Sequence, residues 1–174
     1  MHKKRFLLSV TLISILLIST SATDSVKPKW QKYTHTASNS QILFPGDFTE
    51  KVKVKESSNG EEYRTTKVTS MHNNIVYFFG ITMHASDFVY SEDLEDISIN
   101  AFLKGVGGTE TARNVWERKG KDGVEVTLDT QDAEMTYRVL IVDKKQVQVV
   151  IARPKAEEIN PKTRKKFLKS FKMK

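Results

Sequence analysis

The sequence predicts an α+β fold, an antiparallel sheet of about six to eight strands with helices packed on it. Two observations carry this prediction. Most of the chain after residue 38 alternates apolar and polar residues with a period of two, as strands of an antiparallel sheet do. Two segments with helical spacing of apolar residues, after Ser91 and after Pro161, interrupt the strands, so the order is strands, helix, strands, helix.

The first 22 residues have the pattern of a cleaved export signal. Cations at residues 3–5 precede an apolar run from Phe6 to Ile18, and small residues follow up to Ala22. A run of this length spans about 20 Å as a helix, less than the ~30 Å hydrocarbon core of a membrane. We therefore expect cleavage near Ala22 and an exported, periplasmic or secreted protein.

The charge of the chain is concentrated at its C-terminal end. The whole sequence carries +7, and loss of the three cations at residues 3–5 leaves +4. Residues 162–174 contain seven cations and no acid, so residues 23–161 sum to −3. Export argues against nucleic acid as a partner. The absence of cysteine excludes disulfides, thiol catalysis and thiolate metal sites.

The mature chain has the size of a single domain, at about 150 residues. Residues 23–38 are polar, and we expect a lead-in that Trp30 and Tyr33 order in part. Residues 39–174 then form one α+β domain, expected to be a monomer without a cofactor.

Alternation defines the first strands. Residues 42–45 end a strand at Pro45-Gly46, and residues 51–55 alternate valine with lysine. Residues 63–72 form a polar-alternating strand, which Asn73-Asn74 joins to residues 75–82 by a tight hairpin turn. Since both faces of residues 75–82 are apolar, this strand is expected at the centre of the sheet.

Helix signals begin at Ser91, which is expected to cap free backbone amides. Four carboxylates follow, which suit the positive end of a helix, and glycines at 105, 107 and 108 end it. The expected apolar stripe of this helix consists of Leu94, Ile97, Phe102 and Leu103. The remaining elements are strands at 113–118, 124–130, 134–143 and 145–153, and a last helix at 162–171 after Pro161.

The last helix has one apolar face, formed by Phe167, Leu168 and Phe171. Burial of each of these side chains contributes ~1.5–3 kcal/mol, enough to dock a terminal helix on a sheet. The other faces carry Lys165, Lys166, Lys169 and Lys172. The alternative is an arm that binds an anionic membrane or polymer, to which each lysine contributes about 1 kcal/mol.

Five short motifs occur in one order: "ILFPGDF" (42–48), "IVYFFGIT" (75–82), Gly107-Gly108, "MTYRVLIVDKKQVQVVI" (135–151) and "KFLKSF" (166–171). In that order they resemble a group of exported bacterial proteins of unknown function. The fold of that group is similar to the PsbP family, the α/β/α sandwich known from the lumenal subunit of the photosystem II oxygen-evolving complex. The resemblance covers residues 39–172 and implies a compact sandwich with an accessory or binding role, without a catalytic residue to transfer. The extra C-terminal lysines and the turn at 143–145, which lacks the usual glycine, depart from the pattern.

One candidate partner surface lies on the strand at 113–118. Arg113, Trp116 and Arg118 combine an aromatic ring with cations, a combination that suits protein recognition. The alternative places Trp116 beneath a helix, since tryptophan is usually buried.

A metal site is the weakest of the candidate sites. His72 and His84 flank the strand at 75–82, and Asp87 is the nearest further carboxylate, whereas a metal site needs three or four ligands. We expect surface histidines instead, and no metal.

No catalytic motif occurs in the sequence, so we expect a non-enzymatic accessory module of the bacterial cell envelope that binds an unknown envelope protein or supports assembly. The alternatives are peripheral binding to anionic lipid or polymer through the last helix, and a small metal-binding protein or hydrolase.

Overall fold

The computed structural model describes residues 27–57, 59–118 and 120–173, without the side chain of Arg118. The predicted signal segment, residues 1–22, lies outside the described residues, as do the first four residues of the predicted lead-in.

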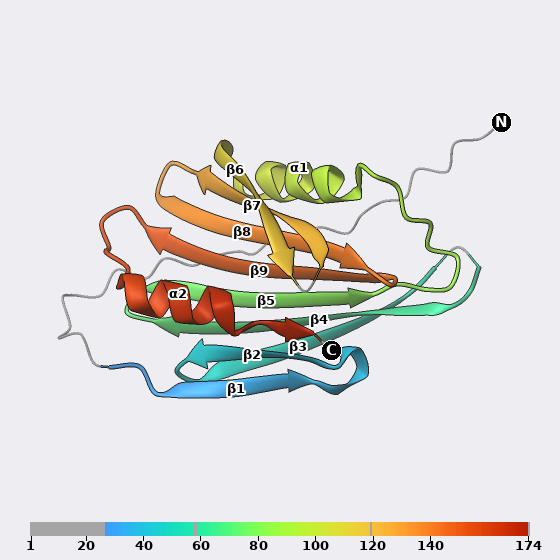
Figure 1. The fold of residues 1–174 in the computed structure, drawn as a ribbon, viewed down its shortest axis with the longest axis horizontal. Coiled ribbons are helices and arrows are strands. Elements are labelled where there is room, and N and C mark those ends of the chain that lie inside the picture. The colour runs from blue at the N-terminus through green and yellow to red at the C-terminus, as the bar shows by residue number, and fades with distance from the viewer. Residues whose placement is uncertain (1–26, 58, 119, 174) are drawn as a thin grey trace.

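A seven-stranded antiparallel sheet forms the centre of the domain (Figure 1). Its strand order is β3-β4-β5-β9-β8-β7-β6, so β9 lies centrally beside β5, and β3 and β6 form the two edges. The strands are β3 (Phe48–Glu56), β4 (Glu62–His72), β5 (Ile75–Met83), β6 (Thr109–Arg118), β7 (Lys121–Asp129), β8 (Ala133–Val142) and β9 (Lys145–Pro154). The predicted α+β class with an antiparallel sheet is therefore confirmed.

A second, three-stranded sheet has the order β1-β2-β10. Its strands are β1 (Trp30–His35), β2 (Ser40–Pro45) and β10 (Lys172–Met173), with a short 3-10 helix, η1 (Thr36–Ser38), between β1 and β2. The segment expected as a lead-in thus contains a strand that pairs with β2 along its whole length. The C-terminal residues pair with the other edge of β2, Lys172 opposite Gln41.

Different elements pack on the two faces of the large sheet. The small sheet and α2 (Pro161–Ser170) pack on one face, around Tyr77, Phe79 and Val149. Helix α1 (Leu94–Val106) packs on the other face, against β7 and β8. Within the described part of the chain, neither helix combines the length and apolar character that membrane crossing requires.

Two hairpin turns use left-handed backbone without glycine. Asn73 and Asn74 have φ of 49° and 58°, as the sequence predicted for this turn. Asp143 and Lys144 adopt the same conformation, with φ of 47° and 57°. Aspartate tolerates this region better than most residues, which lets the β8–β9 turn form where a glycine was expected.

The start of α1 differs from the prediction. The helix begins at Leu94 after Asp93, and the Ser91 hydroxyl donates a hydrogen bond to the Asp93 carboxylate at 2.5 Å instead of capping a backbone amide. Leu94, Ile99 and Phe102 are the buried apolar residues of the helix, whereas Ile97, predicted to lie on the buried stripe, is exposed. Ser98 shares the inward face with these residues, and with about 3.6 residues per turn Ile97 falls outside that face.

Candidate functional site

Helix α2 begins with a strong N-terminal cap. The Asn160 side-chain oxygen accepts hydrogen bonds from the backbone amides of Lys162 at 2.9 Å and Thr163 at 3.4 Å. Pro161 occupies the first turn, where its missing N–H costs nothing. A ten-residue helix is too short to be stable alone in water, so its order depends on packing.

The inward face of α2 joins the main core. Phe167, Leu168 and Phe171, the three residues that the sequence analysis placed on the docking face, are all buried. The centroid of the Phe167 ring lies 5.1 Å from that of Tyr77 and 5.6 Å from that of Phe44, between the two sheets. These contacts fix the helix on the large sheet and so fix the direction in which its outer residues point.

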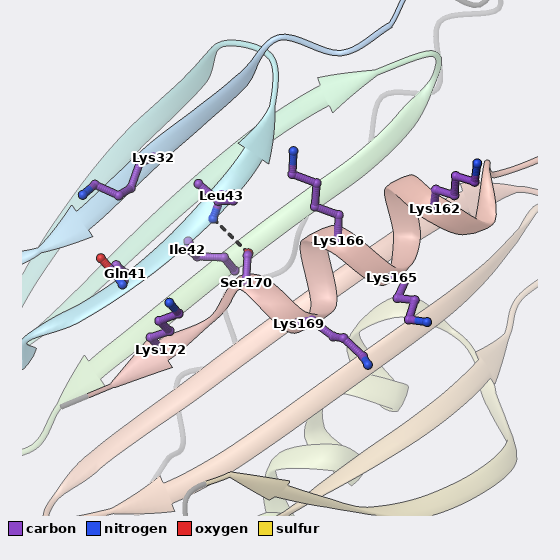
Figure 2. Close-up of a pocket in the computed structure, with 10 residues that line it drawn as sticks. All are labelled: Lys32, Gln41, Ile42, Leu43, Lys162, Lys165, Lys166, Lys169, Ser170 and Lys172. Atoms are coloured by element: carbon purple, nitrogen blue, oxygen red, sulfur yellow. Dashed lines mark hydrogen bonds between the residues drawn. The ribbon is translucent and has the colours of Figure 1, made fainter.

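A groove of about 570 Å³ lies between α2 and β2, and we call it the lysine groove (Figure 2). The uncharged part of its lining consists of Gln41, Ile42, Leu43 and Ser170. The other residues that line it are Lys32, Lys162, Lys165, Lys166, Lys169 and Lys172, all exposed. Because no carboxylate lines the lysine groove among the described residues, its ammonium groups together create a strongly positive surface.

The lysines of the groove differ in orientation. The Lys166 ammonium lies 4.5 Å from the centroid of the Trp30 ring, a cation–π contact between α2 and β1. In Figure 2, Lys165 and Lys169 extend from α2 on the side away from β2, and Lys172 lies beside Gln41. The four lysines that the sequence predicted as an anionic-surface contact therefore lie on one outer surface, and Lys32 from β1, which sequence reasoning missed, joins them.

The structure does not bring Arg113 and Trp116 together. Both lie on β6, at positions whose side chains point to opposite faces of the sheet. Arg113 forms ion pairs with Glu110 and Asp96 on the α1 side. Trp116 is buried on the α2 side, with its ring centroid 5.7 Å from that of Phe171, so the packed alternative describes Trp116. Arg118 ends β6, and its side chain lies outside the described residues.

Trp116 also contacts Arg138, which links α2 to the large sheet. The Arg138 guanidinium carbon lies 5.2 Å from the centroid of the indole ring. Arg138 also pairs with Glu125 at 2.5 Å and donates to the backbone carbonyl of Leu168 at 2.8 Å. It thereby ties the C-terminal turn of α2 to β7 and β8.

His72 and His84 lie too far apart to share a metal ion. His72 ends β4 opposite Ile75, and His84 follows the far end of β5, so a nine-residue strand separates them, roughly 30 Å. The His84 ring stacks on Phe88 with 3.9 Å between centroids, and burial lowers its pKa. Within the described residues, neither these histidines and Asp87 nor any other side chains form a group of three that could hold a metal ion.

A buried polar network, which the sequence did not reveal, links the small sheet to the large one. His35 Nδ1 lies 2.7 Å from the Ser38 hydroxyl, which donates to the Ser40 hydroxyl at 2.9 Å. His35 Nε2 lies 3.2 Å from the Thr66 hydroxyl in β4, and burial is the main cause that lowers the His35 pKa. This serine–histidine pair is closed off from solvent, since all four residues are buried, and its role is to join the sheets.

Comparison with known proteins identifies the fold. No protein-family model matches the chain, and no curated protein matches it. The structure is similar to the solution structure of cyanobacterial PsbP from Synechocystis sp. PCC 6803, with a TM-score of 0.57 and 9% sequence identity. The match covers 90% of this chain and 99% of that one. The protein therefore has a PsbP-like fold, as the order of its sequence motifs predicted.

Proposed function

We propose that the protein is a non-enzymatic, exported accessory module of the bacterial cell envelope that binds an acidic protein partner through the lysine groove. The observation that carries the proposal is the set of six lysines on one outer surface, without a carboxylate in the described lining. An acidic partner supplies the missing charges, steers the encounter and fixes the register of the complex.

Two further features support a binding role. The lysines lie on a helix and strands that the main core holds in place, so little order has to be gained on binding. The polar groups that resemble catalytic pairs, such as His35 and Ser38, are buried and bonded to one another. The N-terminal export pattern supports a partner outside the cytoplasm.

Photo-crosslinking in the native cell tests this proposal. p-Benzoylphenylalanine placed at position 32 samples the lysine groove, and the same residue at position 115 samples an exposed site on the α1 face of β6. We expect one discrete crosslinked protein from position 32 only. Its yield should fall at least about tenfold when Lys165, Lys166 and Lys172 are changed to Gln, because three charge contacts of even ~0.5–1 kcal/mol each are lost. An identical crosslinking pattern from both positions would contradict the proposal.

A second candidate, peripheral binding to anionic lipid, is favoured by the exposed apolar side of the groove. Leu43 is half-buried on the floor, beside the ammonium groups of α2. Each lysine near an anionic surface contributes about 1 kcal/mol. Flotation with phosphatidylglycerol vesicles separates the two candidates, since lipid binding requires no partner protein and is lost in the Lys→Gln variant.

A further inference from the structure

A short exposed segment precedes α1. Residues 89–93 are the last residues before the helix, and all five are exposed. Val89 and Tyr90 supply two neighbouring apolar side chains, 79% and 56% exposed, and two carboxylates follow at Glu92 and Asp93. We call residues 89–93 the acidic segment. Because apolar side chains exposed next to each other are typical of interaction sites, this segment has the character of a surface that a partner covers.

The acidic segment keeps an unbalanced negative charge. Neither Glu92 nor Asp93 forms an ion pair with another of the described residues. The Asp93 carboxylate accepts a hydrogen bond from the neutral hydroxyl of Ser91 at 2.5 Å. The pKa of Tyr90 is raised, first by burial and then by the charges of Glu95 and Glu92, as expected beside a negative surface. The segment is therefore a suitable ligand for a cationic site.

Several other carboxylates of the domain already have cationic partners. Asp129 pairs with Lys155 at 2.9 Å, and Glu134 pairs with Arg153 at 3.0 Å. These carboxylates would have to give up a partner before they could bind a lysine of another molecule, whereas the acidic segment would not.

The acidic segment and the lysine groove lie on different sides of the seven-stranded sheet. The segment leads into α1, which packs on one face, whereas α2 and the small sheet pack on the other face (Figure 1). Since the sheet separates the two surfaces, they cannot meet within one molecule. A contact between them has to join two molecules.

Charge also decides which kind of association is favourable. Two lysine grooves that face each other would bring six lysines against six, and like charges across an interface are unfavourable. A symmetric dimer through the groove is therefore disfavoured, whereas a groove that meets the acidic segment of another molecule pairs opposite charges. Such a contact uses two different surfaces, so it joins molecules head to tail.

We propose that a second copy of this chain occupies the lysine groove and inserts its acidic segment there, head to tail. This inference rests on the proposed function, since it names the acidic partner of the same site. Glu92 and Asp93 supply the carboxylates that the described lining lacks, and the apolar side chains of the segment cover the half-buried Leu43. The contact is small, so the protein is the expected monomer when dilute and associates where its local concentration is high.

Sedimentation velocity of the purified protein, over a range of protein concentrations, tests this inference. The segment variant E92Q/D93N removes the two charges of the acidic segment, and the groove variant K165Q/K169Q/K172Q removes three charges of the lysine groove. The matched control E56Q/E62Q removes two charges from exposed positions of β3 and β4. Circular dichroism confirms that each variant folds.

The wild type and the control should associate as the protein concentration rises at about 0.02 M salt and dissociate at about 0.5 M salt, where the charges are screened. The segment variant and the groove variant should each associate at least about tenfold more weakly, because two or three charge contacts are lost. An equimolar mixture of these two variants should form a dimer, because one supplies an intact groove and the other an intact segment. That dimer should not grow, since its remaining surfaces are the substituted ones.

A wild type that stays monomeric at low salt, or a mixture of the two variants that forms no dimer, would overturn the inference. A crosslink from position 32 to a different protein in the cell would then still support the proposed function. If position 32 also gave no discrete crosslink, the proposed function would fail as well.

Discussion

The backbone amide of Leu43 donates a hydrogen bond to the side-chain hydroxyl of Ser170 at 2.9 Å, and this bond joins β2 to the last turn of α2. The same hydroxyl donates to the carbonyl of Phe167 at 2.7 Å. One side chain therefore closes the helix and fastens it to the small sheet. The lysine groove lies along this junction, so its geometry depends on a bond between residues 127 positions apart in sequence.

Ser170→Ala should destabilise the protein by about 1 to 2 kcal/mol, because the Leu43 amide loses its acceptor in a half-buried site. The midpoint of urea unfolding measures this loss. The matched control is Ser91→Ala, which removes an exposed hydroxyl and should change stability by less than about 0.5 kcal/mol. Equal midpoints for the two variants would show that the Ser170 bond does not fasten α2.

Phe167→Ala should cost about 3 to 5 kcal/mol, the usual range for truncation of a buried phenylalanine. The lost ring contacts are those with Phe44 and Tyr77, one from each sheet, so the small sheet should loosen together with α2. Denaturant unfolding measures the cost, with Lys165→Ala as the control on the exposed face of the same helix. A variant F167A as stable as K165A would mean that α2 contributes nothing to the core.

Arg138→Met should destabilise the protein by about 2 kcal/mol, because it leaves the largely buried Glu125 carboxylate without its guanidinium partner. It also removes the donor to the Leu168 carbonyl at the end of α2. Lys155→Met is the control, since its ion pair with Asp129 is about half exposed and should contribute less than about 1 kcal/mol. Thermal unfolding compares the two variants. A K155M variant less stable than R138M would contradict this prediction.

Stability should decrease as the pH falls below about 6.5, the ordinary pKa of histidine in an unfolded chain. Burial lowers the pKa of both His35 and His84 in the folded protein. Below pH 6.5 the unfolded chain therefore binds protons that the folded protein does not bind, and unfolding becomes easier. The stability that depends on these two histidines staying neutral is fully present above pH 6.5. It is lost as the pH falls toward their lowered pKa values in the folded protein.

Urea midpoints at about pH 7.5 and about pH 5 measure this effect, which linkage relates to proton uptake. The double variant H35Q/H84Q should show a smaller difference between the two midpoints than the wild type, whatever its absolute stability. An unchanged difference would assign the pH dependence to other groups.

The strands of the large sheet could be predicted because their signals are local. The predicted strands at 63–72 and 145–153 match β4 and β9 within one residue at each end, since alternation and turn residues coincide there. The inward face of α2 followed equally from the spacing of Phe167, Leu168 and Phe171. In each case the residues that decide the structure are close together in the sequence.

The small sheet could not be predicted, because no local sequence pattern marks its strands or shows which strands pair. Strand β1 lies in a polar segment, where only Tyr33 and His35 point inward, and β10 has two residues. The burial of Trp116 depends on its contact with Phe171, which is 55 residues later in the chain. The grouping of four lysines on one face of β3 and β4 likewise required the β3–β4 register, because alternation shows Lys51, Lys53 and Lys55 but not that Lys67 joins them.

Amide hydrogen exchange of α2 tests the central claim most directly, which is that the core holds this helix as a fixed platform for its lysines. The account predicts that the amides of residues 165–170 exchange only through global unfolding, with the same protection as the central strands β5 and β9. Exchange of those amides through local opening, at free energies well below that of global unfolding, would contradict it and would make the lysines part of a loose arm.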